Sequence, residues 1–198
     1  MFSFKWNRLT DAHAEALETV INTALRSVKL PSSLGALDIS GLRFGKSAPS
    51  VELLGLSEVD PVVRQTILDL YEDLKEEGDE VQIHAQIRYS GDAEFRVSTA
   101  LLVNFPTPAF ASLPVSLRVH SCVFEGTVLL VYLGESLFIG FEDDGSKTGP
   151  LKSLKFEADI GDKDKSVLKN TKVTDLIAQQ LTEAIKTKLV YPAMLKVR

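Results

Sequence analysis

Alternation of apolar and polar side chains dominates the middle of the chain. Residues 80–90 place an apolar side chain at every second position, and the same period returns over residues 93–103. A period of two predicts β-strands with one apolar and one polar face. The short link Ser90-Gly91-Asp92 predicts a turn, so we expect the two runs to pair as a hairpin. Further strands are predicted over residues 36–44, 50–56, 114–124, 127–133, 136–142 and 153–160.

Three other segments repeat their apolar residues at a helical period. The first follows Thr10-Asp11, which supplies an N-cap and an acid in the first turn, and Pro31 closes it. The second lies near residues 61–77, and the third runs from about Ser166 to Leu189. Each carries one apolar stripe, as helices that pack against a sheet do. The chain is therefore predicted to be an α+β protein with one domain over residues 1–198.

The predicted sheet is wider than the predicted helices can cover. A ten-residue strand is about 33 Å long, whereas a helix is about 10 Å across. A twisted sheet of this size can curl and leave an apolar trough, which a soluble protein seldom leaves bare and which suits an apolar ligand. The sheet can equally close into a barrel that its own side chains fill. Alternation alone does not distinguish the two arrangements.

Composition excludes several classes of function. The 198 residues are 44% hydrophobic and 25% charged, as in an ordinary globular domain. A net charge of −5 argues against a nucleic-acid partner. The single cysteine, Cys122, excludes an intrachain disulfide and makes a cysteine-based zinc site implausible, which fits a reducing compartment. With neither a bilayer-spanning apolar run nor a signal peptide in the sequence, we expect a soluble, cytosolic protein.

Charge is distributed unevenly along the chain. Residues 52–80 carry ten acidic and two basic side chains, a balance of −8, while residues 151–198 carry ten basic and six acidic ones, a balance of +4. Each basic residue near an anionic bilayer contributes about 1 kcal/mol of attraction. The basic end is therefore a candidate for membrane contact, although such a run is more often a solvated face.

Motifs for catalysis and metal binding are all incomplete. Gly41–Ser47 has three residues before its Gly-Lys pair where a phosphate-binding loop needs four. The Asp162-x-Asp164-x-Ser166 segment lacks the glycine and the final glutamate of a calcium loop. His13, His84 and His120 lie in separate predicted elements, without metal-ligand spacing. The sequence thus predicts no enzyme and no metal or cofactor site.

A different set of residues resembles a known family. The segments Tyr89-Ser-Gly-Asp92, Thr99–Phe110 with its Asn-Phe-Pro-Thr-Pro block, and Leu113-Pro114 with Leu117 resemble the centre of an SMP (synaptotagmin-like, mitochondrial and lipid-binding protein) domain. The resemblance is closest to the soluble mitochondrial distribution and morphology subunits of the fungal ER–mitochondria encounter structure. Supporting matches are Phe2-x-Phe-x-Trp6 with Leu9, Leu30-Pro31, Phe44-Gly45 with Pro49, Glu157, Ile160-Gly161, Val167–Asn170 and Leu189–Pro192. The long polar inserts common in the family are short here.

The resemblance implies both a fold and a function. The fold is a twisted antiparallel half-barrel sheet with two to three packed helices, which form an elongated groove for the tails of glycerophospholipids. The function is that of a lipid-binding and lipid-transfer subunit of a tethering complex, with bound glycerophospholipid as its ligand and no cofactor. Its partners would be an ER-anchored SMP-domain subunit and other members of the complex. It would lie peripherally, at contacts between the endoplasmic reticulum and the mitochondrial outer membrane.

Two groups of residues are candidates for these roles. The lipid-binding candidates follow the inward-facing alternation, and we expect about half of them to touch lipid: Ile83, Ile87, Phe95, Val97, Leu101, Leu117, Val119, Leu130, Ile139, Phe156, Ile177 and Leu181. Phe2, Phe4 and Trp6 form an apolar N-terminal strand over residues 1–7 that either pairs two copies as a homodimer or is an ordinary edge strand. The alternative function is an interaction scaffold with a collapsed groove and no lipid.

Overall fold

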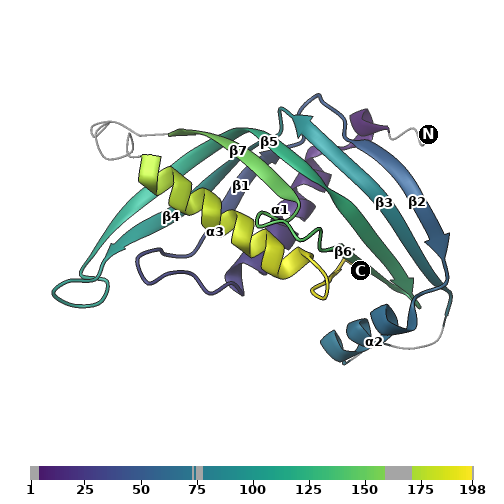
Figure 1. The fold of residues 1–198 in the computed structure, drawn as a ribbon. Helices are drawn as coiled ribbons and strands as arrows, with labels where there is room; N and C mark the ends of the chain where they lie inside the picture. Colours follow the sequence, from purple (N-terminus) through teal and green to yellow (C-terminus); the bar gives the residue numbers. More distant parts are fainter. Residues whose placement is uncertain (1–4, 73, 75–77, 159–170, 198) are drawn as a thin grey trace.

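One antiparallel sheet with helices on both of its faces forms the protein (Figure 1). The computed structural model describes residues 5–72, 74, 78–158 and 171–197. The elements of these residues are, in chain order, η1 (Trp6–Arg8), α1 (Asp11–Arg26), β1 (Asp38–Arg43), β2 (Ser50–Ser57), α2 (Pro61–Leu70), β3 (Glu80–Gly91), β4 (Glu94–Val103), β5 (Ala111–Leu133), β6 (Ser136–Phe141), β7 (Leu151–Ala158), α3 (Thr171–Leu189) and β8 (Leu195–Lys196).

Local side-chain bonds set the beginnings of the first two helices. The backbone N–H of Thr10 donates to His13 Nδ1 at 3.2 Å ahead of α1. The Asp60 carboxylate accepts from the Val62 N–H at 2.7 Å, and Pro61 occupies the first turn of α2. Helix α2 ends at Leu70, earlier than predicted, because the next residue, Tyr71, is extended and donates its hydroxyl to the Met194 carbonyl at 2.8 Å. Tyr71 thus ties the end of α2 to the C-terminal segment.

The longest feature of the sheet is a hairpin whose two arms are each more than twenty residues long. Strands β3 and β4 follow one another along a single arm and both pair with β5: Glu80 lies opposite Leu133, and Val103 lies opposite Ala111. The turn of this hairpin is therefore the segment 104–110. The predicted hairpin between residues 80–90 and 93–103 is wrong, because Ser90-Gly91-Asp92 continues the strand direction instead of reversing it.

Tyr89 explains why this link does not reverse the chain. Its ring lies over Gly91, where an added Cβ would come within 2.5 Å of the ring. Its hydroxyl accepts a hydrogen bond from the Ala93 N–H at 2.8 Å and donates to the Phe44 carbonyl at 3.3 Å. The glycine therefore makes room for an aromatic ring that bridges the interruption between β3 and β4.

The two runs predicted over residues 114–124 and 127–133 form one strand, β5. The glycine that separates them, Gly126, stays within the strand, where an added Cβ would lie 3.0 Å from the Phe141 ring. Gly126 provides space for a side chain on the neighbouring strand and does not mark a turn. A register shift between Val119 and Ser121 changes the inward-facing positions of β5 from odd to even numbers.

The sheet stays open, which decides between the trough and the closed barrel. Among the described residues, the edge strands β1 and β2 each pair with one neighbour, β4 and β3 respectively. In Figure 1 the sheet arches over α1 and α3. We call this face, which carries Val97 and Leu117, the inner face. Helix α2 packs on the opposite, outer face through Ile67, beside Leu129 and Val131 of β5.

The N-terminal segment differs from its prediction. Its described part forms a 3-10 helix at Trp6–Arg8 instead of a strand, while Phe2 and Phe4 lie outside the described residues. The indole N–H of Trp6 donates to the Gly45 carbonyl at 3.1 Å. At Trp6, therefore, the structure has a side-chain anchor to its own chain where a strand was predicted.

Candidate functional site

The inner face divides into two halves that have different covers. In the filled half, α1 and α3 lie over β1, β4, β7 and the first part of β5, and their side chains interlock in one cluster. Leu117 and Ile177 meet in this cluster with none of their surface exposed. In the open half, formed by β2, β3, β6 and the last part of β5, the cover within the described residues is limited to the end of α3, where Leu189 and Val190 pack beside Phe141.

Cross-strand pairing builds the open half from rows of apolar side chains. One row crosses four strands, because Leu56 pairs with Ile83, Ile83 with Leu130, and Leu130 with Ile139. A second row runs through the pairs Leu53–Ala85, Ala85–Val128 and Val128–Phe141. Directly opposed residues of antiparallel strands project on the same face. The alternation along each strand thus adds up to a continuous hydrocarbon surface.

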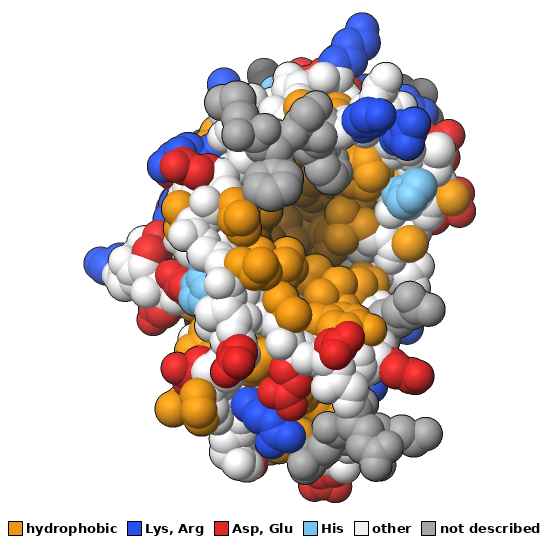
Figure 2. All heavy atoms as spheres, turned by 90° about the vertical axis from the view of Figure 1, so that its right-hand side faces the viewer, with side chains coloured by type: hydrophobic (Ala, Val, Ile, Leu, Met, Phe, Trp, Pro, Cys, Tyr) orange, Lys and Arg blue, Asp and Glu red, His pale blue; other side chains and the backbone are white. Residues whose placement is uncertain are grey.

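This surface is exposed at its rim. Leu53 is 41% exposed, Leu56 67% and Tyr132 42%, and Ile83, Ile87, Leu130 and Ile139 are half-buried. Figure 2 shows a hollow lined by hydrophobic side chains on this side of the molecule. Among the described residues of these rows none is charged. The open half is therefore a wide apolar groove, suited to hydrocarbon and without a group in these rows that would bind a charged headgroup.

The structure separates the twelve predicted lipid-binding residues into three groups. Ile83, Ile87, Leu130 and Ile139 line the groove. Phe95, Leu101 and Phe156 are partly buried against the filled half. The remaining five are exposed by at most 2%, within protein side chains: Val97, Leu117, Val119, Ile177 and Leu181. We assign these five to the packed core, because side chains of α1 and α3 fill the space against this part of the inner face.

Sequence reasoning missed the contribution of β2 to the groove. Val51 and Leu53 alternate as inward residues at odd-numbered positions, but a register shift between Leu53 and Gly55 brings the even-numbered Leu56 to the same face. Tyr132 lies two residues after the predicted Leu130 on the same face of β5 and was not among the predicted residues. The available signal was the density of leucines over residues 50–57, which is high for a short edge strand.

The link between β3 and β4 lies at the junction of the two halves. Asp92 accepts hydrogen bonds from the backbone N–H groups of Lys46 and Ser47, each at 3.0 Å. These bonds lower the pKa of Asp92 to about 2, because they stabilise its charged form. Burial raises the pKa of the Tyr89 hydroxyl and of the Cys122 thiol. Asp92 and Tyr89 thus fix the backbone at the junction through their hydrogen bonds, and the tyrosine and the thiol are neutral at physiological pH.

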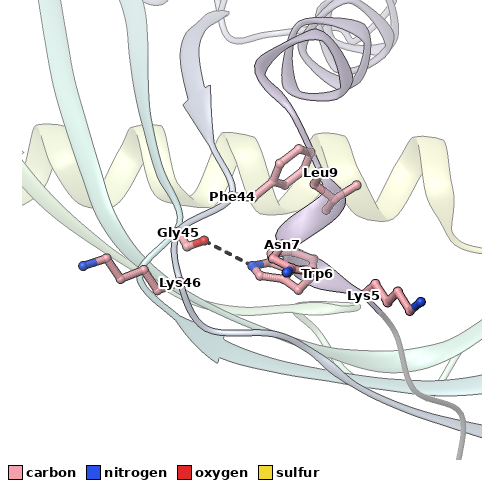
Figure 3. Close-up of a pocket in the computed structure, with 7 residues that line it drawn as sticks. All are labelled: Lys5, Trp6, Asn7, Leu9, Phe44, Gly45 and Lys46. Carbon is pink, nitrogen blue, oxygen red and sulfur yellow. Dashed lines mark hydrogen bonds between the residues drawn. The ribbon is translucent and has the colours of Figure 1, made fainter.

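An open pocket of about 640 Å³ adjoins this junction (Figure 3). Trp6 and Phe44 meet edge to face in it, with ring centroids 5.5 Å apart, and Lys5, Asn7, Leu9, Gly45 and Lys46 complete its lining. Figure 3 shows the two lysine side chains pointing away from each other. The pocket does not gather ionisable groups for catalysis. The hydrogen bond from Trp6 to Gly45 and the ring contact with Phe44 hold Trp6 against its own chain.

The described residues contain no group of three or more histidine, cysteine, aspartate or glutamate side chains arranged to hold a metal ion. No helix among them combines the length and apolar character needed to cross a bilayer.

Comparisons with known proteins agree with this architecture. The family described as Mitochondrial distribution and morphology protein 12 matches residues 64–149, which run from α2 through β6 and include most of the open half. A solved structure, the crystal structure of Mmm1, superimposes with a TM-score of 0.50 at 18% identity, covering 98% of this chain and 76% of that one. The fold is thus confirmed as the open antiparallel half-barrel with packed helices that was predicted.

Similarity to curated proteins extends over nearly the whole chain. Mitochondrial distribution and morphology protein 12 of Laccaria bicolor is 24% identical, covering 95% of this chain and 94% of the relative. The protein of the same name from Schizosaccharomyces japonicus is 21% identical, with 96% of both chains covered. These alignments run over 260 and 266 positions, so both relatives carry residues that this 198-residue chain lacks.

The chain shares its fold, an open antiparallel sheet with packed helices, with the solved Mmm1 structure. In sequence it is similar to mitochondrial distribution and morphology protein 12 of fungi, as the sequence resemblance predicted. The names of these relatives refer to the distribution and morphology of mitochondria.

Proposed function

We propose that this chain binds glycerophospholipids and transfers them as a subunit of a complex that tethers the endoplasmic reticulum to mitochondria. The observation that carries the proposal is the groove of the open half, where apolar rows continue across β2, β3, β5 and β6 and no described helix covers them beyond the end of α3. The acyl chains lie along these rows, with the headgroup in solvent.

The physical task of such a carrier is to shield hydrocarbon from water. Exposing an acyl chain costs about 0.8 kcal/mol per methylene, so two tails with about thirty methylenes cost on the order of 20 kcal/mol if fully bared. From Val81 to Ile87 the groove spans about 20 Å at about 3.3 Å per residue, longer than the roughly 15 Å of hydrocarbon in one leaflet. The groove therefore has the length to remove most of this barrier without any covalent step.

The uncharged lining also bears on selectivity. With no charged side chain in the rows of the groove among the described residues, recognition is by the tails, which most glycerophospholipids share. We therefore expect weak discrimination between headgroups. Bound glycerophospholipid is the ligand in this proposal, and no other cofactor has a role.

The partners in this proposal follow from the family resemblance of the sequence. An ER-anchored SMP-domain subunit, other members of the encounter structure and a second copy of this chain are the protein partners. The location is peripheral, at contacts between the endoplasmic reticulum and the mitochondrial outer membrane, in keeping with the similarity to mitochondrial distribution and morphology proteins. For a homodimer formed through Phe2, Phe4 and Trp6, the structure adds one constraint. Because Trp6 is anchored on Gly45, its use between copies requires that this bond be exchanged.

Native mass spectrometry of the freshly purified chain tests lipid binding. We expect added phospholipid mass on the unmodified chain and loss of most of that mass in the Ile87→Trp variant, because a larger ring occupies groove volume. Val62→Trp is the matched control, since Val62 is 68% exposed on α2 and lies away from the groove. Ile83→Trp serves as the second groove variant if Ile87→Trp does not fold.

Two results would contradict the proposal. An unmodified chain without bound phospholipid would favour the interaction scaffold, whose function resides in docking alone. Undiminished phospholipid in folded Ile87→Trp and Ile83→Trp variants would show that the groove is not where the lipid lies.

A further inference from the structure

The turn of the long hairpin, residues 104–110, exposes more aromatic surface than any comparable segment among the described residues. Phe105 is 81% exposed and Phe110 62%, and next to them Val103 is 50% and Leu113 44% exposed. In Figure 1 this loop projects from the lower left, at the opposite end of the sheet from α2. Contiguous exposed apolar side chains of this kind mark contacts with another surface.

Hydrogen bonds hold the loop in a defined shape. The Asn104 side chain donates to the Ser32 carbonyl and accepts from the Ala109 N–H, each at 2.7 Å. The Phe110 N–H donates to the Thr107 carbonyl at 3.2 Å, and Ala109 has a positive φ of 51°. Because Asn104 ties the loop to the α1–β1 connection and to itself, the two phenylalanines are presented with little further loss of conformational entropy.

The charge around this loop differs from that of the rest of the chain. No carboxylate occurs in the sequence between Glu94 and Glu125, and the two bases of this stretch, Arg96 and Arg118, lie opposite each other seven residue pairs away from the turn. Glu94, at its boundary, is bonded to Arg118 at 2.8 Å. At and around α2, the described residues include six acidic side chains, Glu58, Asp60, Asp69, Glu72, Asp79 and Glu80, and one basic side chain, Arg64. An anionic surface is therefore repelled at the α2 end and not at the hairpin end.

The size of the patch distinguishes a bilayer from a protein as the occupant. An aromatic side chain buries about 150–250 Å², so two phenylalanines with two aliphatic neighbours fall well short of the roughly 800 Å² per partner of a stable protein interface. A narrow projecting loop with two aromatic side chains suffices to enter the boundary between headgroups and acyl chains, where apolar anchors bury to a depth of about 5–10 Å.

We propose that the 104–110 turn is the point at which the protein docks on a phospholipid bilayer, with Phe105 and Phe110 inserted and the acidic α2 end directed away. This assignment rests on the proposed function, since it supplies the contact surface that a lipid carrier needs. It is tested separately, because groove occupancy and bilayer docking are different measurements.

Flotation with vesicles made of equal parts phosphatidylcholine and phosphatidylserine tests the assignment on the full chain. We expect F105S/F110S to lower the bound fraction by about tenfold or more, because the variant loses both apolar side chains whose burial drives insertion. The control V62S/L70S removes two exposed apolar side chains from α2, which are 68% and 49% exposed, and should bind as the unmodified chain does. Native mass spectrometry should find bound phospholipid unchanged in both double variants.

A second measurement places the loop directly. Bromine-labelled phospholipid in the same vesicles should quench the fluorescence of Phe105→Trp and leave that of Val62→Trp unchanged, once the signal of Trp6 in the unmodified chain is subtracted. Equal flotation of F105S/F110S and the unmodified chain overturns the proposal. It is also overturned if the double variant keeps vesicle binding and loses a protein partner, or if Phe105→Trp is not quenched.

Discussion

The two halves of the inner face follow the same sequence rule and differ in what covers them. In the filled half, Val97 and Leu117 alternate with polar residues and are completely enclosed by α1 and α3. In the open half, Ile83 and Leu130 alternate in the same way and stay half-buried beside the exposed Leu56. An alternating strand therefore specifies an apolar face, and the helix positions decide whether that face becomes core or groove.

This difference also has a functional consequence. Close-packed interiors leave few voids larger than a water molecule, so the filled half provides rigidity and has no room for a guest. The open half keeps an apolar area that the described helices do not fill, and an apolar ligand completes it. One sheet thus contains a rigid, filled half and an open half that can bind an apolar ligand. Three sets of substitutions test this division.

The largest effect is expected from matched leucine truncations. Leu117→Ala removes a side chain with no exposed surface and should lower the free energy of unfolding by about 2–5 kcal/mol. Leu56→Ala removes one that is 67% exposed and should change it by at most about 0.5 kcal/mol. Urea unfolding followed by circular dichroism measures both. A loss of similar size in the two variants would contradict the division into a filled and an open half.

A smaller effect is expected at the junction, where the strand passes from one half to the other. Gly91→Ala places a methyl group within 2.5 Å of the Tyr89 ring and should lower the free energy of unfolding by about 1–3 kcal/mol. Gly55→Ala is the control, because an added Cβ there meets nothing within 4 Å. Equal stability of the two variants in urea would show that the packing of Tyr89 over Gly91 does not fix the junction.

The smallest effect concerns pH at the same junction. The pKa of Asp92 is lowered to about 2 in the folded chain, against about 3.9 for an unfolded aspartate. A carboxylate with a lowered folded-state pKa stabilises the fold above pH about 4, and this contribution is lost as the pH falls toward 2. Asp92→Asn should therefore lower the urea midpoint at neutral pH and converge with the unmodified chain near pH 2. A difference that does not depend on pH would assign the effect to geometry and not to charge.

Particular residues show how far sequence reasoning reached. It located the helices and most strands, because apolar period is a property of consecutive residues. It misplaced the hairpin turn, since Gly91 and Gly126 were interpreted as breaks, whereas each makes room for an aromatic ring whose position the fold sets, Tyr89 and Phe141 respectively. It named four groove residues and missed Leu53 and Leu56, whose facing depends on a register shift in β2.

The sequence by itself determined which side chains are apolar, at what period, and in which order the strands and helices occur, because these follow from local alternation and capping. It also carried the resemblance to the SMP-domain family through the Asn104–Phe110 block. Tertiary structure alone decided that α1 and α3 fill one half of the inner face and leave the other uncovered. The reason is physical: burial depends on which elements meet across the sheet, and no pattern within one element specifies its neighbour.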